Sequence, residues 1–263
     1  MGGSKLMKRI GRRRSKENKN GREVIVASFE SLPSEVVVEV LGRIASSSFT
    51  DFFNAKLSSK ILNEAADDNY IYQQMSLEKF PVVPWRVTTE ASCFLNKCKE
   101  SGNPEALYRQ GVVDYFSLMR IESGLESLNR AASSGHRGAL YVLSIIFLFS
   151  EDDEFKKQGI RILSSIHKSK PTSGKRRLIR ECRDKLREIV RMIWVVNPLV
   201  QKQRPSTCCA IRDNDVDRHE RLGRRRRRRG WESDDEDDDD EVECDGCRCD
   251  REVDSVCNMF PRA

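Results

Sequence analysis

Nearly all the large apolar side chains of this 263-residue chain lie between residues 29 and 200, and charge dominates the two ends. The 47 Lys and Arg residues nearly balance the 41 Asp and Glu residues, but the two signs are segregated. Residues 1–28 carry nine cations against two Glu, residues 218–229 carry eight Arg, and residues 232–243 carry ten acidic side chains. Such segments bury too little apolar surface to fold. The sequence therefore predicts a folded middle region, a disordered basic arm at 1–28 and a disordered linker at 197–243.

The sequence pattern argues against a membrane-spanning protein and against a secreted protein. The longest apolar stretch, Ala139–Phe149, is about half of the roughly 20 residues that a membrane-spanning helix needs, so no membrane partner is expected. The N-terminus is basic but has no apolar segment behind it, which argues against a secretory signal. Nine cysteines without such a signal favour a reducing compartment, and we expect the nucleus, the cytoplasm or both.

The region 29–84 predicts three short helices. Ser31-Leu32-Pro33 is typical of a helix start, and apolar residues then recur at spacings of three and four up to Ile44. A second helix is expected from Thr50 to about Ala66, and a third from Asn69 to Leu77. These helices predict a small bundle with one strongly apolar face.

This region resembles an F-box in the order of its residues, Leu32-Pro33-x-Glu35-x-x-x-Glu39-x-Leu41-x-x-Ile44, then Asp51-Phe52, Ser59-Lys60 and Asp67-x-x-Tyr70. Leu62 stands where the motif usually has tryptophan. The resemblance implies a three-helix module that docks on the Skp-type adaptor of a cullin–RING ubiquitin ligase. Its docking face would include Leu32, Pro33, Val37, Val40, Leu41 and Ile44. An unrelated helical bundle is the alternative.

The region 90–196 predicts a helical repeat. Ala106-Leu107-Tyr108 matches Ala139-Leu140-Tyr141, and Gly124 matches Gly159 in the following helices. Small residues at these positions let paired helices approach closely. The pattern resembles the TPR-related Sel-like repeat, which implies a short α-solenoid with a surface that binds a protein client. The expected fold class is therefore all-α.

The region 244–263 is rich in cysteine. Thiolates at these spacings can bind one tetrahedral zinc ion, and four protein ligands would make it a structural site. The predicted ligands are Cys244, Cys247, Cys249 and Cys257, with Cys208, Cys209 and His219 as alternatives. Free or redox-sensitive thiols are the other interpretation, so no cofactor is required. Elsewhere, structural thiols in buried or half-buried helix positions are expected at Cys93, Cys98 and Cys182.

Two arginine-rich runs indicate nuclear import or contact with nucleic acid. They contain Arg12, Arg13 and Arg14 in the arm, and Arg224, Arg225 and Arg226 in the linker. Because aromatic residues are not interleaved with them, sequence-specific recognition of nucleic acid is not expected.

Nothing in the sequence indicates an enzyme. No glycine-rich phosphate loop follows a strand, and His136 is expected to be a capping or surface residue and not a catalytic one. The order of segments is similar to a plant family of F-box proteins. This resemblance implies a substrate-recruiting subunit of a ubiquitin ligase. A nuclear protein bound to nucleic acid or chromatin, and an interaction scaffold outside any ligase, are the alternatives.

Overall fold

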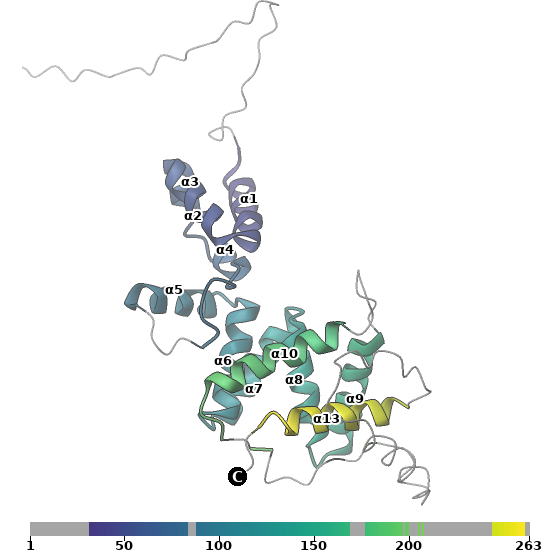
Figure 1. Cartoon of the computed structure of the whole chain (residues 1–263). Coiled ribbons are helices and arrows are strands. Elements are labelled where there is room, and N and C mark those ends of the chain that lie inside the picture. Colours follow the sequence, from purple (N-terminus) through teal and green to yellow (C-terminus); the bar gives the residue numbers. More distant parts are fainter. Residues whose placement is uncertain are drawn as a thin grey trace, which may run out of the picture.

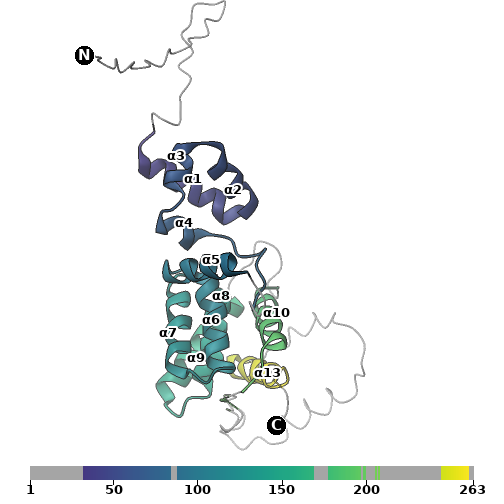
Figure 2. The same cartoon turned by 90° about the vertical axis from the view of Figure 1, so that its left-hand side faces the viewer.

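The computed structural model describes residues 32–83, 88–168, 177–196, 198–199, 205, 207 and 244–260. These residues form α-helices, and no strand occurs among them, which confirms the expected fold class. Figures 1 and 2 show a small group of helices, α1–α4, at one end of the molecule and a larger stack, α6–α10 with α13, at the other. Helix α5 lies between the two. The expected arm at 1–28 and nearly all of the linker at 197–243 lie outside the described residues.

The small module contains one more helix than the sequence predicted. Its helices are α1 (Ser34–Ser47), α2 (Phe49–Ser58), α3 (Lys60–Ala65) and α4 (Asn69–Gln74). The helix expected from Thr50 to Ala66 is interrupted at Ser59, whose backbone is extended (φ −152°, ψ 142°). In one continuous helix, the ten-residue separation of Phe52 and Leu62 would point their side chains about 80° apart. The interruption lets both side chains enter the same core.

Helix α5 (Thr89–Glu100) packs against the core of this small module. Its Phe94 ring lies 5.5 Å from the Phe49 ring and 5.0 Å from the Phe80 ring, and Phe53 and Tyr72 complete the cluster. Aromatic pairs at these distances add to the free energy of apolar burial. The sequence assigned α5 to the repeat, so its contribution to the core of the preceding module is a finding of the structure.

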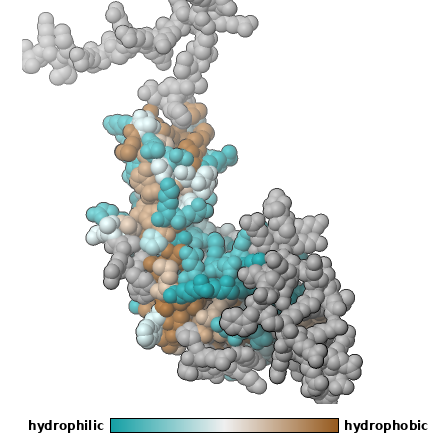
Figure 3. Space-filling model, viewed as in Figure 1, coloured by the Kyte–Doolittle hydropathy of each residue, from teal (hydrophilic) through white to brown (hydrophobic). Residues whose placement is uncertain are grey.

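The repeat consists of two antiparallel helix pairs followed by a covering helix. The pairs are α6 (Pro104–Phe116) with α7 (Ile121–Ser133) and α8 (Arg137–Leu148) with α9 (Asp153–Lys168), and α10 (Arg177–Met192) crosses α6 and α8. Glycines allow the close approach that the sequence predicted. A Cβ atom on Gly124 would lie 2.9 Å from the backbone nitrogen of Tyr115, and one on Gly159 would lie 2.8 Å from the carbonyl oxygen of Ser144. The outer surface of α10 is polar, as the teal band in Figure 3 shows.

The cysteine-rich segment is a helix, α13 (Asp245–Cys257), that belongs to the core of the repeat. Val253, Val256 and Phe260 are buried, and the Phe260 ring stacks 5.0 Å from the ring of Phe116. The cysteine-rich region 244–263, which the sequence set apart from the repeat at 90–196, therefore contributes to the core of that repeat. The reason is the apolar spacing after Arg251, which forms a buried face at helical period.

A buried carboxylate also ties α13 to the repeat. Glu252 is only 2% exposed and accepts hydrogen bonds from the Tyr141 hydroxyl at 3.0 Å and from Arg183 Nε at 3.2 Å. Arg183 comes from α10 and Tyr141 from α8, so one side chain of α13 holds two helices of the repeat. A buried carboxylate is tolerated only where it is paired in this way.

The glycine packing predicts that Gly124→Ala destabilises the protein. Alanine favours the helix by about 1 kcal/mol over glycine, but overpacking against backbone atoms costs typically about 1–3 kcal/mol. We expect a net loss on the order of 1 kcal/mol in the free energy of unfolding, measured by urea denaturation of the full chain. Ser133→Ala, at an exposed position of the same helix, is the control and should change stability by less than about 0.5 kcal/mol. Equal stability of the two variants would contradict the packing account.

Candidate functional site

An exposed apolar strip runs along helix α1 at the outer end of the small module. Leu32 precedes the helix and is 39% exposed, and Val36 and Val40 are 43% and 37% exposed. Their four-residue spacing places them on one face of the helix. Figure 3 shows hydrophobic residues, in brown, at this end of the molecule. Exposed large apolar residues that adjoin one another are typical of a surface that binds another protein.

The structure divides the residues that the sequence predicted for docking. Leu32, Pro33 and Val40 are exposed, Ile44 is half-buried, and Val37 and Leu41 are buried in the core of the module itself. The expectation that Val37 and Leu41 offer their side chains to a partner is therefore corrected. They lie one position after Val36 and Val40, on the neighbouring face that packs against α2, α3 and α4.

Val36 is the member of the strip that the sequence analysis missed. The sequence contains two parallel stripes at four-residue spacing, one with Leu32, Val36 and Val40, and one with Val37, Leu41 and Ala45. Helical periodicity detects both stripes but does not state which faces the core. Ala45 was the signal in the sequence that could have identified the core-facing stripe, because a small residue favours close helix packing.

One buried side chain joins the small module to the repeat. The Asn103 Nδ2 group donates hydrogen bonds to the carbonyl oxygens of Tyr72 at 3.0 Å and Met75 at 2.8 Å, at the end of α4. Its Oδ1 atom accepts the backbone N–H groups of Glu105 and Ala106, both at 3.1 Å, and so caps α6. The side chain thus uses both of its donor hydrogens and both of its acceptor lone pairs. This junction fixes where the repeat begins relative to the exposed strip.

Arg109 reinforces the junction from α6. Its guanidinium donates to the carbonyl oxygens of Leu77, Phe80 and Pro81 at 3.2–3.3 Å and to Glu105 Oε1 at 2.8 Å. The segment that connects the small module to α5 is therefore held by the repeat. No signal in the sequence pointed to this contact, because Arg109 lies about 30 residues from its carbonyl partners.

Glu105 lies at the centre of an ionic cluster beside the junction. His136 Nε2 lies 2.9 Å from its Oε2 atom, and Lys185 Nζ lies 3.4 Å from the same oxygen. Burial alone would raise the pKa of Glu105, but His136, Arg109 and Lys185 lower it well below its ordinary range. His136 Nδ1 also accepts the N–H group of Ala139, which confirms that this histidine caps a helix, α8.

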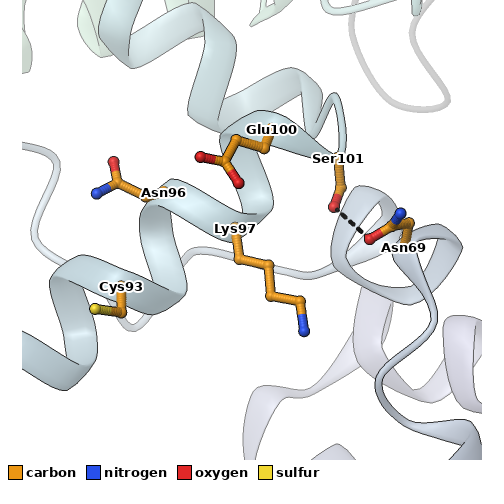
Figure 4. Close-up of a pocket in the computed structure, with 6 residues that line it drawn as sticks. All are labelled: Asn69, Cys93, Asn96, Lys97, Glu100 and Ser101. Carbon is orange, nitrogen blue, oxygen red and sulfur yellow. Dashed lines mark hydrogen bonds between the residues drawn. The ribbon is translucent and has the colours of Figure 1, made fainter.

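Two adjoining depressions lie beside α4 and α5. The first has a volume of about 480 Å³ and is lined by Asn69, Cys93, Asn96, Lys97, Glu100 and Ser101, as Figure 4 shows. The second, of about 570 Å³, shares Glu100 and Ser101 with it and extends to α7. In the first depression, Lys97 lies 4.2 Å from the Tyr72 ring and 3.9 Å from Asp67. These described residues contain no nucleophile paired with a base.

The four predicted zinc ligands do not gather at one point. Cys244 and Cys257 lie at opposite ends of α13, about 20 Å apart at 1.5 Å per residue. Cys249 is buried in the core, and its thiol pKa is raised to about 12 by burial. Among the described residues, no group of three or more candidate ligands is placed to hold a metal ion. The proposed four-cysteine site is therefore corrected. The alternative ligands Cys208, Cys209 and His219 lie outside the described residues.

Two of the three predicted structural thiols agree with the structure, and the predicted basic residues are not among the residues that it describes. Cys98 and Cys182 are buried as expected, whereas Cys93 is exposed on α5. The basic residues Arg12, Arg13, Arg14, Arg224, Arg225 and Arg226 all lie outside the described residues, so their role stays a prediction. In the part of the chain that the structure describes, no helix is both long and apolar enough to cross a bilayer.

Comparison with known proteins identifies two relationships. Residues 77–191 match the model of the plant tetratricopeptide repeats, which covers α5–α9 and nearly all of α10. A protein of Arabidopsis thaliana named as an F-box protein, At1g67623, is 32% identical over 175 residues, which are 66% of this chain and 58% of that protein. The F-box proteins At2g35280 and At1g67340 of the same plant are 27% and 28% identical over 48% and 49% of this chain.

These matches confirm the predicted resemblance to plant F-box proteins with TPR-like repeats. The chain spans 58%, 77% and 34% of the lengths of these three relatives. No solved structure was found to match the chain.

The junction predicts a large effect of Asn103→Ala on stability. The substitution removes a hydrogen bond from each of four backbone groups in a buried position, where a group left unsatisfied costs about 1–3 kcal/mol before relaxation. We expect the free energy of unfolding to fall by about 2–4 kcal/mol in urea denaturation. The same substitution at the exposed Asn69, which makes one long hydrogen bond to Ser101 (3.4 Å), is the control. The account is wrong if the two variants lose equal stability.

The ionic cluster predicts a pH-dependent contribution of Glu105. Because its folded-state pKa lies below the ordinary value of 4.5, its stabilising effect is fully present above that pH and declines as the pH falls further. The stability difference between wild type and Glu105→Gln should therefore be larger at about pH 5 than at about pH 3.5. Urea denaturation of both proteins at each pH measures the difference. A constant difference would show that the carboxylate is not stabilised by its neighbours.

Proposed function

We propose that this chain is a substrate-recruiting F-box subunit of a cullin–RING ubiquitin ligase. The observation that carries the proposal is the exposed strip of Leu32, Val36 and Val40 on α1, in a chain that is similar to named F-box proteins. A Skp-type adaptor would cover this strip, and a cullin would bind through that adaptor. The repeat would hold the protein client.

The strip is suited to this role because its side chains stay exposed among the described residues. The neighbouring stripe of Val37, Leu41 and Ala45 already supplies the core of the module, and each of these residues is at most 2% exposed. Apolar side chains left outside such a core gain free energy by burial against a partner, at roughly 25 cal/mol per Å². The acidic side chains Glu35 and Glu39 lie on the same helix and would give the interface a charged border.

The mechanism is one of proximity. A client held by the repeat would be kept at a fixed distance from the adaptor, because Asn103 and Arg109 join the two modules through buried and half-buried hydrogen bonds. Tethering raises the effective concentration of client lysines near a separate ubiquitin-carrying enzyme. The chain itself would supply no catalytic group, and its basic sequence runs would support residence in the nucleus as well as the cytoplasm.

The strip predicts that the double substitution Val36→Glu/Val40→Glu abolishes binding of the adaptor. Replacing two valines that the adaptor would bury by two carboxylates should weaken binding at least about tenfold, since about 1.4 kcal/mol suffices for that factor. Pull-down and calorimetric titration with a purified Skp-type adaptor measure the loss.

Val196→Glu is the matched control, because Val196 is also 43% exposed but lies beyond α10. We expect it to bind the adaptor like the wild type, and circular dichroism should show that all variants are folded. Equal binding by the α1 variant and the control would exclude the strip as the docking site. No binding by the wild type would favour an interaction scaffold outside any ligase.

A further inference from the structure

Two cysteines meet in the first turn of α13. Cys244 is the N-cap residue of the helix, and its sulfur accepts the backbone N–H group of Cys247 at 3.3 Å. The two sulfur atoms lie 3.4 Å apart, and both side chains are half-buried. This separation is longer than a disulfide bond of about 2.05 Å but short enough that a small side-chain rotation would close it.

The first turn of α13 is anchored on two sides. Asp245 Oδ2 lies 3.1 Å from Lys168 Nζ at the end of α9. Thr207 Oγ1 donates to the carbonyl oxygen of Gly246, and the Thr207 N–H group donates to Asp250. The two thiols are therefore held next to each other by the folded protein.

We propose that Cys244 and Cys247 form a redox-sensitive dithiol that closes to an intramolecular disulfide when a hydroperoxide oxidises it. This inference is independent of the ubiquitin-ligase role. It selects one of the two interpretations that the sequence left open for the cysteine-rich segment.

The reaction needs no group beyond the two thiols and the oxidant. The thiolate of Cys244 attacks one peroxide oxygen, the O–O bond breaks, and sulfenic acid and hydroxide form. The Cys247 thiolate then attacks the sulfenic sulfur, the S–S bond forms, and a second hydroxide leaves. The two thiol protons convert both hydroxides to water. Two thiols are thus oxidised by two electrons, and one hydrogen peroxide molecule is reduced to two water molecules.

The other described cysteines lie elsewhere, and one of them, Cys257, is half-buried at the far end of α13. Cys98 and Cys249 are buried, and burial raises the pKa of each thiol to about 12. Cys182 is buried as well, and its pKa is raised to about 11. Buried neutral thiols of this kind are inert toward oxidants. Cys93 is exposed on α5 and serves as a comparison thiol within the same molecule.

The test uses the purified full chain treated with hydrogen peroxide, then alkylated and digested with trypsin. Cleavage after Arg229 and Arg248 releases a peptide, residues 230–248, whose cysteines are Cys244 and Cys247 alone. We expect the mass of this peptide to fall by the mass of two hydrogen atoms, and its two cysteines to resist alkylation. Both changes should occur while the Cys93 thiol can still be alkylated. Dithiothreitol should restore both alkylation sites.

Two variants make the result specific. Cys247→Ser should stop at the sulfenic acid of Cys244, which dimedone captures, while Cys93→Ser should form the disulfide like the wild type. The proposal is overturned if residues 230–248 keep two alkylatable thiols after Cys93 is oxidised. It is equally overturned if either sulfur bonds to another cysteine, or if a bound zinc ion, released by a thiol-blocking reagent, protects the pair.

Discussion

The arrangement of this protein depends on one carboxamide. Asn103 satisfies the last carbonyl groups of the small module with its amino group and the first N–H groups of the repeat with its oxygen. A backbone group that loses its partner in such a buried place costs more than the hydrogen bond contributes when intact, so the junction has one favourable geometry. Arg109 and the Phe94 aromatic cluster extend the same contact surface. These buried contacts between the two modules therefore set their relative orientation.

Helix α1 shows what the apolar periodicity of a sequence can predict and what it cannot. The sequence predicted an amphipathic helix that begins near Pro33, and the structure begins it at Ser34. The sequence also contains two apolar stripes side by side, and only tertiary packing decides between them. Val37 and Leu41 became core because α4 packs there, with the Tyr70 ring against Gly42. Val36 and Val40 stayed outside, so the exposed stripe lies one residue before the buried one, and its role in docking stays a prediction.

The repeat was predictable for a different reason. Glycines at Gly124 and Gly159 mark close helix contacts, and this requirement is local enough to read from spacing. Helix α13 was not predictable, because its cysteines suggested a metal and its partners, Tyr141 and Arg183, are about 70 to 110 residues distant. Long-range pairs such as Glu252 with Arg183 leave no periodic trace. The predicted four-cysteine zinc site was wrong because the segment is a helix, which keeps the first and the last of the four cysteines apart. In a loop, the same spacing in the sequence would let the four thiols meet.

These features describe a rigid link between an apolar docking strip and a helical repeat, and the central claim is that the strip on α1 binds a Skp-type adaptor. Hydrogen–deuterium exchange of the full chain with and without that adaptor tests the claim most directly. The account predicts slower exchange across residues 34–44 and no change in α9 and α13. Protection confined to α9, α10 or α13, with α1 unchanged, would contradict it.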